Sequence, residues 1–120
     1  MARARIPAGT GESAVAAALA DGTELATATR YLLQLLDDAA PGNTLEVRVP
    51  PYGAVQVVEG PRHTRGTPPN VVEMDAATWI AVATGRVGWD AAIADGLITA
   101  SGQRADLREW LPIAWERMDG

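Results

Sequence analysis

Two periodicities divide the first half of the chain into helical and extended segments. Apolar residues recur every three or four positions over residues 25–36, which predicts an amphipathic helix, and the Ala-rich residues 13–20 predict a shorter helix before it. Residues 45–49 instead alternate apolar and polar side chains, which is the period of a half-buried strand. The sequence Pro-Pro-Tyr-Gly at 50–53 is typical of a turn, so residues 54–58 are expected to return as the second strand of an antiparallel hairpin.

The second half of the chain predicts a third strand, two helices and a fourth strand. An apolar run at 71–74 is followed by Asp75, whose carboxylate can cap the first turn of a helix. Gly85 is expected to end that helix in the left-handed conformation. A short helix over residues 91–95 and a strand over residues 97–100 follow.

A last helix is expected near the C-terminus, because apolar residues there share one helical face: Leu107, Trp110, Leu111, Ala114, Trp115 and Met118. Pro112 lies within this segment, and its ring displaces a carbonyl of the preceding turn, so we expect a kink or a restart. The predicted order is helix, helix, strand, strand, strand, helix, helix, strand, helix, which makes an α+β protein. Residues 1–12 are expected to be a flexible tail, and residues 13–120 a single domain.

Composition restricts the classes of function. The net charge is −5 and the acidic residues are spread along the chain without a basic stripe, which argues against nucleic acid and against stable anchoring on a membrane. No apolar run is long enough to span a bilayer. The chain has no cysteine, which excludes disulfides and thiolate chemistry and fits a reducing cytoplasm. All ten cations are arginine, so no lysine Schiff base can form.

Three short motifs, in this order, resemble the C-terminal half of the sterol carrier protein-2 superfamily. They are a helix ending in Gly85-Arg86, a short helix ending in Ala94-Asp95-Gly96, and a strand followed by a Ser101-Gly102 turn. The sequences TLEVRVPPYGAVQ at 44–56 and RGTPPNVVEMD at 65–75 are most similar to the small bacterial sterol-carrier-like proteins. The resemblance extends over residues 44–112.

The resemblance implies a small, mostly antiparallel sheet covered by helices, with an apolar tunnel for lipid-like ligands and no catalytic chemistry. We therefore expect a non-enzymatic binding or carrier domain for a hydrophobic small molecule, such as a lipid or fatty acid, without a cofactor or metal. The sheet region before Val71 is shorter than in the eukaryotic proteins, which implies a smaller pocket or none. The alternative is a protein-interaction or dimerisation module of the same fold, with a second copy or an enzyme as its partner.

Six apolar-face residues are the candidates for the pocket wall: Val55, Val57, Trp79, Ile93, Trp110 and Leu111. All four tryptophans lie within residues 79–120, in a chain that has no phenylalanine. The alternative for each tryptophan is an ordinary core, because some large side chain must fill the interior. Trp115 lies beyond Pro112, so a lid or an interface is a further possibility for it.

The single histidine, His63, lies between Arg62 and Arg65 in a loop rich in Pro and Gly. The two arginines are candidates for holding an anionic head group such as a carboxylate. The alternative is a solvated loop whose arginines balance an acidic surface. Catalysis by His63 would need an orienting partner and a nucleophile, and no motif of that kind frames it, so we expect no enzymatic activity.

Overall fold

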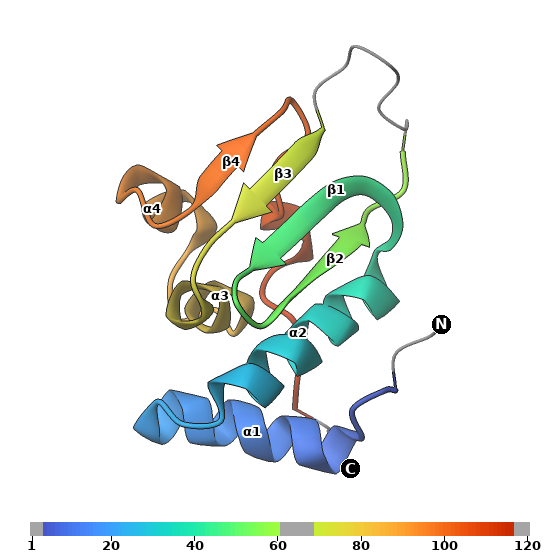
Figure 1. The fold of residues 1–120 in the computed structure, drawn as a ribbon. Coiled ribbons are helices and arrows are strands. Elements are labelled where there is room, and N and C mark those ends of the chain that lie inside the picture. Colours follow the sequence, from blue (N-terminus) through green and yellow to red (C-terminus); the bar gives the residue numbers. More distant parts are fainter. Residues whose placement is uncertain (1–3, 61–68, 117–120) are drawn as a thin grey trace.

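The computed structural model describes residues 4–60 and 69–116 and confirms an α+β fold (Figure 1). Two helices open the chain and a strand hairpin follows, then a third strand, two helices, a fourth strand and a short 3-10 turn. In chain order these are α1 (Ala8–Asp21), α2 (Leu25–Ala39), β1 (Pro41–Val49), β2 (Gly53–Val57), β3 (Asn70–Glu73), α3 (Ala76–Ala83), α4 (Trp89–Ala94), β4 (Thr99–Ser101) and η1 (Arg108–Trp110).

The four strands form one mixed sheet in the order β2-β1-β3-β4. β1 and β2 are the predicted antiparallel hairpin, and β3 and β4 form a second antiparallel pair. The two pairs meet through a parallel contact between β1 and β3. The sheet is therefore mostly antiparallel, with one parallel pair at its centre.

One face of the sheet is covered and the other is open to solvent. Val47 lies opposite Val55 of β2 and Val72 of β3, and the side chains of Val47 and Val72 are fully buried. Their neighbours on β1, Glu46 and Arg48, point to the opposite face and form an ion pair there. α2 packs against β1 and β2, and α1 and α3 pack against α2 (Figure 1). The core therefore lies between the covered face and these helices.

Both ends of α3 are determined by the residues that the sequence predicted. The Asp75 carboxylate accepts a hydrogen bond from the Thr78 N–H at 2.8 Å, and it is the N-cap. After the helix, Gly85 adopts a φ of +82°, the left-handed conformation that glycine permits without steric cost. The short helix α4 begins at Trp89, two residues earlier than expected.

The last predicted helix is wrong: over residues 107–116, the described part of that segment, only the 3-10 turn η1 forms. Leu111 has an extended backbone with ψ 146°, because the ring of Pro112 disfavours a helical conformation for the residue before it. The N–H of Ile113 then donates to the carbonyl of Ala83, at the end of α3, at 2.7 Å. Hydrogen bonding to α3 thus takes the place of a further helical turn.

α1 begins at Ala8, five residues before the expected start and inside the segment predicted to be a tail. The first bond into the helix runs from the Gly11 N–H to the carbonyl of Pro7 at 2.9 Å. Gly11 is buried against the ring of Tyr31 on α2, and a Cβ at this position would overlap that ring. Packing against α2 therefore favours helix where two glycines lower the intrinsic propensity.

Candidate functional site

A groove of about 600 Å³ runs between the N-terminal residues, α2 and the edge strand β2. One wall is formed by residues 4–7, here called the N-terminal arm, together with Thr10 of α1. Val55, half-buried on β2, lies on the sheet side. We call this depression the arm groove.

The arm groove is lined by one face of α2. Thr27, Arg30, Leu33, Gln34 and Asp37 follow each other at intervals of three, three, one and three residues, which places them on the same side of a helix. Arg30 and Asp37 are seven residues apart, roughly 10 Å along the helix axis. The groove therefore has a cation toward one end, an acid toward the other, and the buried side chain of Leu33 between them.

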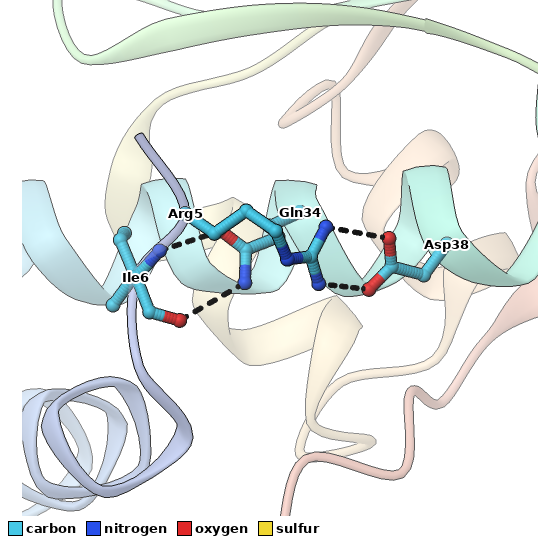
Figure 2. A network of polar contacts seen from close by, with 4 residues as sticks. All are labelled: Arg5, Ile6, Gln34 and Asp38. Carbon is cyan, nitrogen blue, oxygen red and sulfur yellow. Dashed lines mark hydrogen bonds and ion pairs between the residues drawn. The ribbon is translucent and has the colours of Figure 1, made fainter. Parts of the chain in front are cut away.

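The N-terminal arm is held by two side chains of α2 (Figure 2). The Gln34 amide accepts from the Ile6 N–H at 2.9 Å and donates to the Ile6 carbonyl at 3.1 Å. The Arg5 guanidinium donates two hydrogen bonds to the Asp38 carboxylate, at 3.0 and 2.6 Å. Four hydrogen bonds thus attach this wall of the groove to α2.

The hydrogen bonds from Arg5 hold the pKa of Asp38 below its usual value. Because the pKa of Asp38 is lower in the folded protein, its ion pair with Arg5 stabilises the attached arm at pH values above the usual carboxyl pKa. This contribution is lost as the pH falls through the folded-state pKa of Asp38. The two side chains are 65% and 45% exposed, so the pair has little effect on global stability.

Replacing Arg5 with Gln is expected to raise the pKa of Asp38 toward its usual value, because the hydrogen-bonding cation is removed. Titration of the side-chain carboxyl carbons by NMR measures this shift. Arg48→Gln is the matched control, since it removes another exposed arginine, paired with Glu46 on the open face of the sheet. An unchanged pKa in Arg5→Gln would mean that the contact does not form in solution.

Arg30 is positioned by the backbone rather than by an acid. Its Nε–H donates to the carbonyl of Tyr52 in the hairpin turn at 2.8 Å. Arg5, Arg48 and Arg108 form ion pairs, whereas Arg30 forms none within residues 4–60 and 69–116. A charged guanidinium is thus held at the groove without a carboxylate to neutralise it.

The predicted pocket residues lie in several different places. Val55 lines the arm groove. Leu111 lines a separate depression of about 380 Å³ beside α4, where Arg108 pairs with Asp90 at 2.9 Å. These two candidates therefore do not share one pocket.

The other candidates are in the core or at the surface. Val57 and Trp79 are fully buried, and the Trp79 indole N–H donates to the carbonyl of Thr29 at 3.2 Å. Ile93 on α4 is 37% exposed, and Trp110 is half-buried in η1. Arg62, His63 and Arg65 lie outside the described residues.

Sequence analysis missed most of the arm groove. The only signal was the spacing of Arg30, Leu33, Gln34 and Asp37, which forms a second face of α2 beside its core-facing apolar face. The N-terminal arm carried no periodicity at all, because its place is determined by α2 side chains about thirty positions away in the chain.

Residues 4–60 and 69–116 contain neither a metal-binding cluster nor a membrane-spanning helix. No three His, Cys, Asp or Glu side chains gather closely enough to hold a metal ion in this part of the chain. None of its helices combines the length and the apolar character needed to cross a bilayer.

The family comparison agrees with the resemblance seen in the motifs. No curated protein matches the chain. Residues 21–113 match the family described as "Bacterial SCP ortholog", which includes α2, the whole sheet and η1. The N-terminal arm and nearly all of α1 precede the match, so one wall of the arm groove is built from residues outside it. Since the match covers most of its length, the chain belongs to the bacterial SCP ortholog family, the sterol-carrier-like family that its motifs resemble.

Proposed function

We propose that this protein is a non-enzymatic carrier or binding domain for a hydrophobic small molecule, which it takes up in the arm groove. Membership of a sterol-carrier-like family supports a carrier-type role. The observation that carries the proposal is the groove itself, which lies between a helix and the sheet edge and has apolar side chains on three sides. Its volume is within the range typical of small-molecule sites.

The interior between sheet and helices is the other region to compare with the groove as a binding site. There, Leu32, Leu36, Val57 and Trp79 are fully buried. A ligand entering this region would have to displace packed side chains, whereas the arm groove is already open to solvent. This difference favours the groove.

Binding is expected to follow from removal of apolar surface from water. Ile6 and Val55, both half-buried, offer apolar surface to the groove, which the buried side chain of Leu33 also lines. Every methylene of a ligand that is buried against them contributes about 0.8 kcal/mol. No bond of the ligand needs to change, which is consistent with a carrier.

The test compares two aspartate substitutions on the same strand. Val55→Asp places a carboxylate in the groove and is expected to weaken binding of the neutral fluorophore phenylnaphthylamine (NPN) about tenfold or more, because the ligand would desolvate the charge. Ala54→Asp is the matched control, because Ala54 is also half-buried but points to the open face of the sheet. The NPN affinity of this variant is expected to equal that of the wild-type protein. Affinities are measured by fluorescence titration, with thermal unfolding to verify the fold.

Equal affinities of the two variants would place NPN elsewhere and contradict the arm groove as the site. A folded wild-type protein that binds neither NPN nor any other hydrophobic probe would contradict the proposed function. It would favour the interaction module, for which Ile93 and Leu97, 37% and 48% exposed, are the candidate contact surface. Native mass spectrometry of the purified protein, followed by organic extraction, then identifies any co-purified molecule.

A further inference from the structure

We propose that the arm groove selects a short anionic amphiphile, whose charged group pairs with Arg30 and whose apolar body lies under the N-terminal arm. This inference rests on the proposed function and goes further, because it assigns the charge, the orientation and the approximate length of the ligand. Its basis is the distribution of charge along the groove.

Three charged side chains line the groove, and they are not equivalent. Arg5 is already engaged with Asp38 through two hydrogen bonds. Asp37 would repel an anion. Arg30 is the remaining cation, and within the described residues no carboxylate pairs with it. An anionic group in the groove is therefore most favourably placed beside Arg30.

The geometry of Arg30 suits this role. Its Nε–H is bound to the Tyr52 carbonyl at 2.8 Å, which restrains the guanidinium before a ligand arrives. A restrained donor loses less conformational freedom when it binds an anion, and the planar guanidinium has further N–H groups for carboxylate, sulfonate or phosphate oxygens. The hydrogen bond to Tyr52 thus prepares the arginine without neutralising it.

The charged residues at the two ends of the groove determine the orientation of the ligand and its approximate length. Asp37 lies roughly 10 Å along α2 from Arg30, so an anion at the Arg30 end directs the apolar part of the ligand toward Asp37. Leu33 lies between them, with Ile6 of the arm and Val55 of β2 also lining the groove. A body much longer than this interval would reach the acid, which favours a short amphiphile.

The experiment uses two probes of the same aromatic frame that differ in one charged group. Anilinonaphthalene sulfonate (ANS) carries a sulfonate, and NPN lacks it. Wild-type protein is expected to bind ANS about fivefold or more tightly than NPN, because of a charge-assisted contact at a partly exposed site. In Arg30→Gln the ratio is expected to fall to about one, through loss of ANS affinity with NPN affinity retained.

Two controls separate this site from other cationic surfaces. Arg86→Gln removes an arginine that also lacks a described ion pair and lines a smaller depression between α1, α2 and α3, so it is expected to leave both affinities unchanged. Arg30→Lys keeps the positive charge and is expected to retain most of the preference for ANS. If Arg30→Gln does not fold, wild-type protein in about 1 M salt replaces it, since screening is then expected to remove the preference.

Each result bears on a different claim. Equal wild-type affinity for ANS and NPN would overturn the anionic selectivity and leave the proposed function intact. Loss of ANS binding in Arg86→Gln, or its full retention in a folded Arg30→Gln, would overturn Arg30 as the anion site. Absence of binding by both probes would contradict the proposed function as well.

Discussion

Replacing Trp79 with alanine is expected to lower the free energy of unfolding by about 3–5 kcal/mol, the largest effect expected of any substitution considered above. The side chain is 0% exposed, so its removal leaves a large cavity that packed neighbours fill only in part. The Thr29 carbonyl also loses the hydrogen bond from the indole N–H. This is a large share of the roughly 5–15 kcal/mol that stabilises a typical domain.

Urea unfolding followed by circular dichroism measures the effect. Trp79→Phe keeps most of the volume and removes the N–H donor, so it is expected to lie between Trp79→Ala and wild type. Trp110→Ala is a useful comparison, because Trp110 is only half-buried and its loss should be less destabilising. A Trp79→Ala protein as stable as wild type would show that the site collapses around the smaller side chain, and would contradict the packed core.

Replacing Gly11 with alanine is expected to destabilise the protein by roughly 2–3 kcal/mol, although alanine is the better helix former. A Cβ at this position would overlap the ring of Tyr31, which is buried at 4% exposure. Either the ring or α1 has to move. Since Thr10 lines the arm groove beside Gly11, displacement of α1 would also move one wall of that groove.

Gly9→Ala is the matched control, in the same helix and two residues away. No atom lies within 4 Å of a Cβ placed there, so only the helix propensity changes. This variant is expected to be more stable than wild type by about 0.5–1 kcal/mol. Opposite signs for the two substitutions, measured by urea unfolding, are the signature of the α1–α2 contact; equal signs would contradict it.

The parts of the fold that follow from neighbours in the chain were predictable. Asp75 caps α3 because its own carboxylate reaches an N–H three residues on, and Gly85 follows that helix because glycine tolerates a positive φ. The hairpin of β1 and β2 was predictable for the same reason, since alternation and the turn residues lie within one stretch of chain.

The parts that depend on distant segments were not predictable. Nothing in the apolar run at 71–74 shows that β3 pairs with β1 in parallel rather than with β2, because many residues separate the partners. The apolar spacing near Trp110 suggested a helix, yet the backbone there is determined by Pro112 and by the bond from Ile113 to Ala83. A local pattern does not contain that long-range partner.

The candidate site also has one part that was predictable from the sequence and another that was not. Val55 was predicted because a strand alternates its side chains, whereas the role of Arg30 depends on a carbonyl of the hairpin turn, 22 positions away in the chain. The arm groove exists only because Gln34 and Asp38 hold residues that have no pattern of their own.

By itself the sequence determined the α+β class, the order of most elements, the family resemblance and the absence of cysteine chemistry, since each of these depends on residue identity or on short spacings. Only the tertiary structure decided where α1 begins, how the strands are ordered and where a groove opens beside Arg30. Those features arise from contacts between segments far apart in the chain, which are selected by the total packing and hydrogen bonding of the folded molecule rather than by any one segment.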